Sequence, residues 1–179
     1  MKTWLPLLAK SPTYALSVIT VSSALMFGGS TLSRSGEASG QTSNIPILSS
    51  DAWKANNLIK PDELAESLSA PANAKPSVFC VTFPALYQRD HIAGSKFVGP
   101  GSKPDGIQAL KRAVANLPHH HEIVIYCGCC PWVDCPNIRP AFLALKDLGF
   151  TNIKVLYLPN KFQQDWIAAG FPAEKGGVK

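Results

Sequence analysis

The sequence has little charge, and its basic residues form no cluster. Charged residues make up 16% of the 179 positions, and the formal net charge is +5. When Lys2, Lys10, Arg34 and Glu37 of the N-terminal stretch are set aside, 14 basic and 11 acidic residues remain, a net charge of +3. A nucleic-acid interface needs clustered Lys and Arg, so we expect no nucleic-acid partner.

The chain also lacks internal repeats and is too short for several large domains. Its length suits one compact domain with a core of its own, which excludes a multidomain machine. We expect this domain to be a monomer.

Cysteine is scarce outside one short segment. Of five cysteines, only Cys80 stands apart, and the other four, Cys127, Cys129, Cys130 and Cys135, fall within nine consecutive positions. A disulfide-stabilised scaffold would spread its cysteines along the chain. This clustering instead predicts a reactive or metal-binding loop.

Residues 1–29 have the layout of a signal peptide or an N-terminal membrane anchor. Two lysines lie within the first ten residues, the run from Tyr14 to Phe27 carries no charge, and two glycines follow. The run is short for a spanning helix, which needs about 20 apolar residues, so both interpretations stay open. No cysteine lies nearby to carry a lipid. Residues 30–50 are rich in Ser, Gly and Thr and are expected to be a flexible linker. We therefore expect an extracytoplasmic protein, periplasmic or secreted, with or without a membrane tether.

Helix and strand patterns alternate in the domain predicted over residues 51–179. The predicted helices cover residues 61–69, 104–117, 140–148 and 162–169, and the predicted strands cover 78–81, 97–98, 123–126 and 153–158. Such alternation indicates an α/β fold with a central parallel sheet flanked by helices on both faces. Ligands of such folds bind beyond the carboxyl ends of the strands.

Cys127 is the best candidate for a nucleophile. It directly follows Ile123-Val124-Ile125-Tyr126, the clearest strand in the chain, and the next helix begins near Asn137. Backbone N–H groups of the loop over residues 128–137, together with the helix N-terminus, can stabilise an anion there. Since the thiolate is the reactive form of cysteine, this position favours chemistry at Cys127.

Four motifs resemble those of rhodanese-like domains. They occur in the family's order and spacing between about residues 60 and 175: Leu86-Tyr87-Gln88-Arg89-Asp90-His91-Ile92-Ala93-Gly94-Ser95, Ile125-Tyr126-Cys127, Leu145-Lys146-Asp147-Leu148-Gly149-Phe150, and Asp165-Trp166-Ile167-Ala168-Ala169-Gly170-Phe171-Pro172. The resemblance implies a three-layer rhodanese-like α/β domain. It also implies a sulfurtransferase without a cofactor, whose Cys127 carries sulfane sulfur as a persulfide. The sulfur would come from a small donor, thiosulfate or a persulfide, and pass to a thiol acceptor.

The cysteine loop is about five residues longer than is usual in this family. Asn137 stands where the family has an arginine, so Arg139 is expected to supply the cation that orients an anionic donor. We expect Gly128, Cys129, Trp132, Asp134 and Asn137 to line the substrate site. Trp132 would either shield a persulfide from water or pack the longer loop onto the domain.

Two other functions remain open for the cluster. Cys127 and Cys130 form a Cys-x-x-Cys pair, the spacing of thiol-disulfide exchange, and Cys130 would then resolve a persulfide as a disulfide. Alternatively, Cys127, Cys129, Cys130 and Cys135 together bind a soft metal, copper or zinc, in a module without catalysis.

Overall fold

The computed structural model of the chain describes residues 51–177. The predicted signal peptide or anchor (residues 1–29) and linker (residues 30–50) lie outside this part. Within residues 51–177, no helix is both long and apolar enough to cross a membrane.

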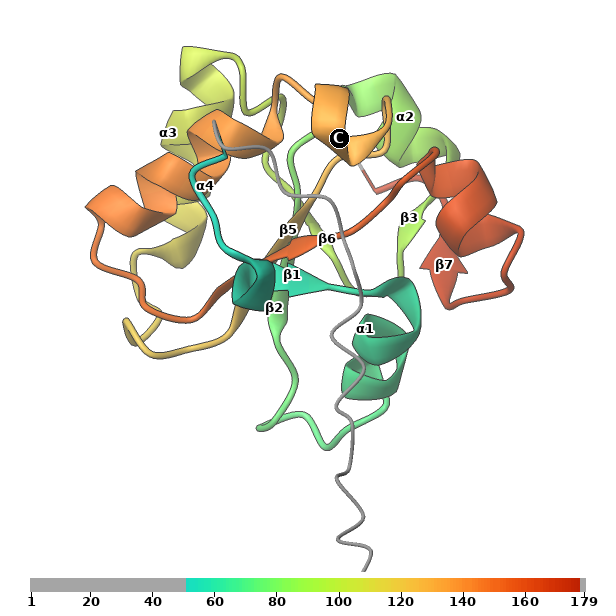
Figure 1. Ribbon diagram of the computed structural model, residues 1–179, viewed down its shortest axis with the longest axis horizontal. Coiled ribbons are helices and arrows are strands. Elements are labelled where there is room, and N and C mark those ends of the chain that lie inside the picture. Colours follow the sequence, from blue (N-terminus) through green and yellow to red (C-terminus); the bar gives the residue numbers. More distant parts are fainter. Residues whose placement is uncertain (1–50, 178–179) are drawn as a thin grey trace, which may run out of the picture. The chain divides into compact units, whose positions relative to one another are not determined.

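A five-stranded parallel sheet forms the centre of the described domain (Figure 1). Its strand order is β1-β6-β5-β2-β4, with bounds Leu58–Ile59 (β1), Ile153–Leu156 (β6), Ile123–Tyr126 (β5), Ser77–Cys80 (β2) and Lys96–Phe97 (β4). Strand β5 pairs with β2 on one side and β6 on the other, and all four of its residues are buried. It is therefore the central strand, as its β-branched composition predicts.

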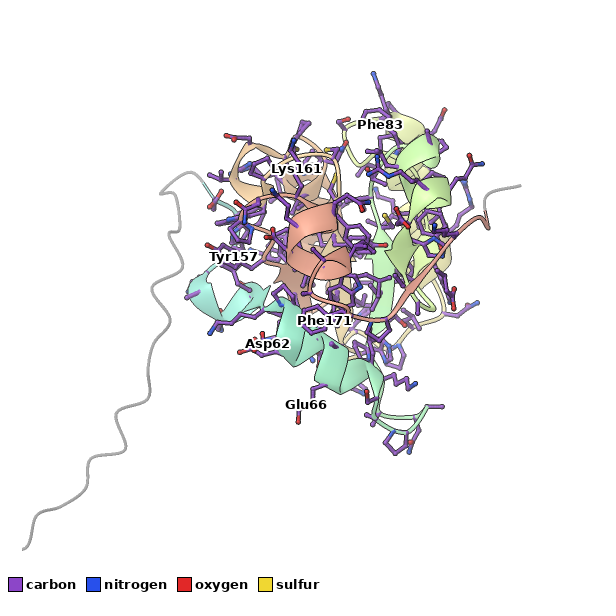
Figure 2. The ribbon with its side chains drawn as sticks, turned by 90° about the vertical axis from the view of Figure 1, so that its right-hand side faces the viewer. Asp62, Glu66, Phe83, Tyr157, Lys161 and Phe171 are labelled. Carbon is purple, nitrogen blue, oxygen red and sulfur yellow. The ribbon has the colours of Figure 1, made fainter. Side chains whose placement is uncertain are left out.

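Helices cover both faces of the sheet and confirm the predicted layers (Figure 1). Helices α3 (Pro104–Val114) and α4 (Ile138–Asp147) pack against one face, where their apolar side chains share a core with Phe79 and Ile125. Helix α1 (Pro61–Leu68), helix α2 (Pro84–Arg89) and a π-helical turn, η3 (Gln163–Ile167), contribute to the core on the other face. Figure 2 shows Asp62 and Glu66 on the outer side of α1.

The predicted helices and strands are present, with ends that differ by a few residues. One differs in kind: residues 162–169 were expected to be an α-helix and contain the π-helical turn, closed by the Ala168 N–H bond to the Gln163 carbonyl at 2.9 Å. The structure adds short elements that were not expected. These are strand β1, helix α2 and the 3-10 turns η1 (Ala55–Asn57) and η2 (Trp132–Asp134). Strands β3 (His91–Ile92) and β7 (Ala173–Glu174), which form an antiparallel pair, were also not expected.

Helix α3 packs so closely on the turn before it that only glycine fits at position 106. A Cβ atom on Gly106 would overlap the carbonyl oxygen of Pro100. Alanine in a helix is normally more stable than glycine by about 1 kcal/mol. We predict the opposite sign for Gly106→Ala, a loss of about 1–3 kcal/mol, because the overlap forces the backbone apart. Urea unfolding measures the change. Gln108→Ala, at an exposed position of the same helix, should be neutral or stabilising, and a stabilised Gly106→Ala protein would contradict the prediction.

Candidate functional site

The cysteine loop begins at the carboxyl end of β5 and is tied to its neighbours. Its Trp132 N–H donates to the carbonyl oxygen of Leu158, just beyond β6, at 2.9 Å. The Trp132 ring is buried, with its centroid 5.8 Å from that of Trp53 and 5.5 Å from that of Tyr157. Of the two roles expected for Trp132, the packing of the loop onto the domain is therefore the one that the structure supports.

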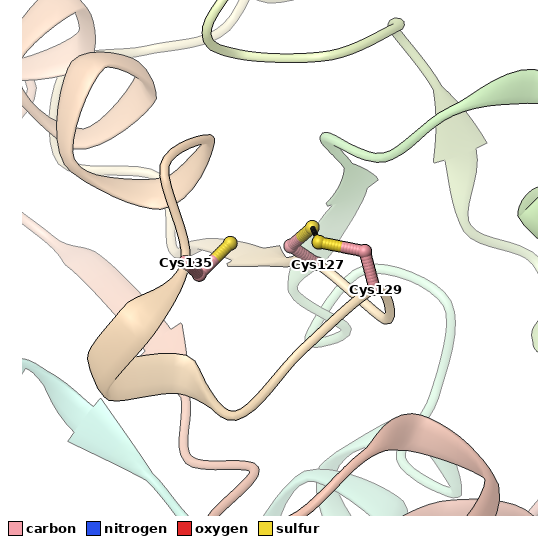
Figure 3. A group of neighbouring side chains, drawn as sticks. All are labelled: Cys127, Cys129 and Cys135. Atoms are coloured by element: carbon pink, nitrogen blue, oxygen red, sulfur yellow. Dashed lines mark hydrogen bonds between the residues drawn. The ribbon is translucent and has the colours of Figure 1, made fainter.

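Four sulfur atoms gather in this loop. The Sγ atom of Cys129 lies 3.1 Å from the Sγ atom of Cys127 and 3.1 Å from that of Cys130. Cys135 approaches from the opposite limb of the loop, and its thiol points toward Cys127 and Cys129 (Figure 3). The sulfurs of Cys127, Cys129 and Cys135 all lie within 4.8 Å of one another, and Cys130 is outside this set. All five cysteines of the described residues are free thiols.

The cluster is buried on one side and open on the other. Cys127 is 1% exposed and Cys135 is 0% exposed, whereas Cys129 and Cys130 are half-buried. A reactant from solvent therefore meets Cys129 or Cys130 before it meets Cys127.

The amide of Asn137 makes polar contacts with two of the sulfurs. Its Nδ2 atom donates to Cys127 Sγ at 3.4 Å and lies 3.8 Å from Cys129 Sγ. Its Oδ1 atom accepts a hydrogen bond from the Ser102 N–H at 3.0 Å, which fixes the orientation of the amide. Asn137 is fully buried and immediately precedes α4. The predicted site residue Asn137 thus contacts the thiols.

The hydrogen bonds within the cluster separate the acidities of its thiols. The hydrogen bond from Cys127, and then the nearby thiol of Cys135, lower the pKa of Cys129 to about 4 despite partial burial. The hydrogen bond that Cys127 donates to Cys129 raises the pKa of Cys127. The nearby sulfurs of Cys127 and Cys129, and then burial, raise the pKa of Cys135. The structure therefore assigns the thiolate to Cys129, whereas the sequence favours Cys127.

Arg139 does not take the expected position beside the sulfurs. Its Nε atom donates to Asp51 Oδ1 at 3.0 Å, its Nη2 atom forms an ion pair with the same oxygen, and its Nη1 atom donates to the Val133 carbonyl at 3.1 Å. The guanidinium also lies over the Trp53 ring, 5.3 Å from its centroid. Among the described residues, no Lys or Arg hydrogen-bonds to a cysteine of the loop. Asp51 and Val133 thus hold the Arg139 guanidinium in a structural contact, rather than in the expected contact with the sulfurs.

Of the other residues expected at the substrate site, Gly128 packs the loop and Asp134 lies on the surface. Gly128 passes so close to Phe162 that an added Cβ atom would lie 3.0 Å from the Phe162 Cβ atom. The side chain of Asp134 is exposed. Cys80 lies on the other face of the sheet with Tyr126, where burial raises its pKa to about 12.

Solved structures of other proteins are similar to this chain. The BH2092 protein from Bacillus halodurans matches with a TM-score of 0.52 and 19% identity, over 67% of this chain and 77% of that chain. The rhodanese-like domain of the Alr3790 protein from Anabaena sp. matches with a TM-score of 0.48 and 21% identity, over 69% and 87%. Ygr203w, a yeast protein tyrosine phosphatase of the rhodanese family, matches with a TM-score of 0.42 and 15% identity, over 60% and 81%.

No protein-family model and no curated protein sequence matches this chain. The sheet order and the covering helices confirm the expected three-layer α/β fold with a central parallel sheet, and the match to the BH2092 protein supports it. At these identities the likeness establishes the fold, and the chemistry has to be argued from the cysteine loop itself.

The low pKa of Cys129 predicts an unusual pH profile for its alkylation. An ordinary thiol reacts with iodoacetamide about tenfold faster for each pH unit up to its pKa of about 8.5. We expect Cys129 to react at a nearly constant rate from about pH 5.5 to about pH 8, because it remains a thiolate throughout. Peptide mass spectrometry measures the rate for each cysteine, and buried Cys80 should stay unmodified in the folded protein. A tenfold rise per unit at Cys129 would disprove the assignment.

The same ionisation links Cys129 to stability. Its pKa is depressed in the folded state, so its stabilising contribution is complete above the pKa of the unfolded chain, about 8.5. The contribution falls as the pH falls and is lost near pH 4.

Arg139→Ala should destabilise the domain without changing the acidity of the thiols. Removing the guanidinium leaves the buried carboxylate of Asp51 and the carbonyl of Val133 without these donors, which predicts a loss of about 2–4 kcal/mol. Chemical unfolding measures the loss, and the alkylation profile of Cys129 measures the acidity. Arg139→Lys, which keeps the charge but not the forked geometry, should be intermediate in stability. A large shift of the alkylation profile at unchanged stability would restore the role expected from the sequence.

Proposed function

We propose that the protein is a sulfurtransferase that carries sulfane sulfur on its cysteine loop. The observation that carries the proposal is the contact between the half-buried thiolate of Cys129 and the buried thiol of Cys127, at the carboxyl end of the central strand of a rhodanese-like fold. Several thiols in mutual contact suit the passage of a sulfur atom from one to the next. Phosphate transfer is less well supported, because the Arg139 guanidinium that would clamp a phosphate is held by Asp51.

The order of transfer follows from exposure. Cys129, which solvent reaches, attacks the outer sulfur of the donor. A new S–S bond forms at Cys129, the donor's own S–S bond breaks, and the donor leaves as a thiolate. The outer sulfur then passes to Cys127, 3.1 Å away, while the proton of Cys127 moves to Cys129. The family resemblance implies that Cys127 carries the sulfur. In the proposed order Cys127 is the second carrier, and its burial protects the persulfide until an acceptor thiol takes the sulfur.

The charge of the site favours a persulfide over thiosulfate as the donor. Thiosulfate carries two negative charges and would approach the thiolate of Cys129, while Arg139 is paired with Asp51. A persulfide carries at most one negative charge, and the repulsion is smaller. The proposed partners are therefore a small persulfide donor and a thiol acceptor, and the proposed setting is extracytoplasmic.

Thiol-disulfide exchange would use a different sulfur contact from the one that the sequence indicates. The Sγ contacts join Cys127 to Cys129 and Cys129 to Cys130, so Cys129 lies between the two members of the Cys-x-x-Cys pair. In sulfur transfer, Cys130 is placed to attack the inner sulfur of a Cys129 persulfide. That step forms a Cys129–Cys130 disulfide and releases hydrosulfide.

Mass spectrometry of the full-length reduced protein after exposure to a persulfide donor tests the proposal. We expect the protein to gain a sulfur atom, found as a persulfide on Cys129 or on Cys127. The gain should be slower with thiosulfate. Cys129→Ser should slow the labelling of Cys127 by roughly 100-fold, because the buried thiol loses its intermediary. Cys127→Ser should leave the persulfide on Cys129, and Cys80→Ser should change neither.

Two results would count against this function. Labelling of Cys127 at the normal rate in Cys129→Ser would overturn the order of transfer. A protein whose loop gains no sulfur from either donor, or forms only disulfides, is not a sulfurtransferase.

A further inference from the structure

Cys135 has no part in the proposed sulfur transfer, although it is the most deeply buried thiol of the loop. It is 0% exposed, yet its sulfur points at the same small volume as the sulfurs of Cys127 and Cys129 (Figure 3). A third convergent thiol is not needed to pass a sulfur atom between two others. It is what a three-coordinate metal ion requires.

We propose that Cys127, Cys129 and Cys135 bind one Cu(I) ion as a three-thiolate site. Metal–thiolate bonds of about 2.3 Å place three sulfurs about 4 Å apart around a central ion. The three sulfurs here lie within 4.8 Å of one another, and those of Cys127 and Cys129 are 3.1 Å apart. Side-chain shifts of about 1 Å would therefore bring all three to the bonding distance.

The donor set selects the kind of ion. Thiolates are soft ligands and favour Cu(I) and Zn(II) over the harder ions that prefer oxygen. A structural zinc site is almost always four-coordinate. The set of converging ligand atoms found among the described residues contains three sulfurs, and Cys130 is not a member of it. Three soft ligands without a fourth fit Cu(I) better than Zn(II).

The surroundings of the three sulfurs suit a bound cation. Three thiolates within 4.8 Å of one another would repel, and a cation bound between them would reduce that repulsion. Asn137 directs its amide hydrogens toward Cys127 and Cys129. Residues around a metal–thiolate centre commonly hydrogen-bond to the ligand sulfurs in this way. Cys127 and Cys135 are buried, while half-buried Cys129 offers a route of entry for the ion. The ligands bind as thiolates, so a proton still held by a ligand sulfur is released to solvent.

This inference does not rest on sulfur transfer, although it uses two of the same thiols. An ion bound to Cys127 and Cys129 would block persulfide formation on both. The two states are therefore mutually exclusive, and their readouts differ: metal stoichiometry for one and a covalent sulfur adduct for the other.

Anaerobic titration of the reduced full-length protein with Cu(I), in competition with a chromophoric Cu(I) chelator, tests the site. We expect one Cu(I) per chain and a thiolate-to-metal absorption band. Cys135→Ser and Cys129→Ser should each weaken Cu(I) binding at least 100-fold. Asn137→Ala should weaken it roughly 10- to 100-fold, the usual effect of losing an outer hydrogen bond. The matched controls Cys130→Ser and Cys80→Ser should stay within about threefold of the unmodified protein.

Folding has to be checked for the buried position. If Cys135→Ser fails to unfold cooperatively, Cys129→Ser at the half-buried position decides the result. Three outcomes would overturn the proposal: no stoichiometric Cu(I), Cu(I) binding that survives Cys129→Ser, or binding that depends on Cys130 as strongly as on the other three. The last outcome, with Zn(II) bound in preference to Cu(I), would identify a four-cysteine zinc site instead. A protein that binds Cu(I) but gains no sulfur would refute sulfur transfer alone.

Discussion

The hydrogen bonding of β5 to strands on both of its sides is the constraint on which the site depends. With β2 and β6 in register along it and helices over both faces, β5 cannot shift without disrupting the core. The position of Cys127 is therefore set by the sheet. The Trp132 N–H bond ties the loop that follows to Leu158, just beyond β6, so the loop is attached to the sheet at two neighbouring strands. Sulfurs on the two limbs meet because the sheet holds the limbs in place.

Four sulfurs lie close together beside few polar partners, so negative charge on more than one of them is unfavourable. The thiols share hydrogen bonds, and one of them, Cys129, ionises at the expense of Cys127 and Cys135. A further negative charge in this volume would need a cation, or would have to be spread over a longer sulfur chain. Sulfur transfer and soft-metal binding, the two chemistries proposed for this loop, both meet this need and use the sulfurs as a group.

The sequence predicts what depends on periodicity and misses what depends on distant contacts. The apolar run over residues 123–126 identifies the central strand and places Cys127 at its end, because burial on both faces leaves a clear pattern. The true environment of Arg139 could not be predicted, since its partner Asp51 lies 88 residues earlier in the chain. The ionisation of Cys129 depends on loop geometry, for which spacing gives no rule. Elements of two residues, such as β1 and β3, are too short to show a period.

The turn before α3 determines which end of an amide faces the sulfurs. The Ser102 N–H engages Oδ1 of Asn137, so the amide hydrogens face Cys127 and Cys129, and a flipped amide would lose this bond and direct its oxygen at them. Gly101 lies against the Asn137 backbone so closely that a Cβ atom there would overlap its carbonyl oxygen. The local field at the sulfurs, positive from N–H or negative from oxygen, is thus fixed by a segment that contains no cysteine. A chain could change its affinity for anionic sulfur by altering this turn alone, with every thiol left in place.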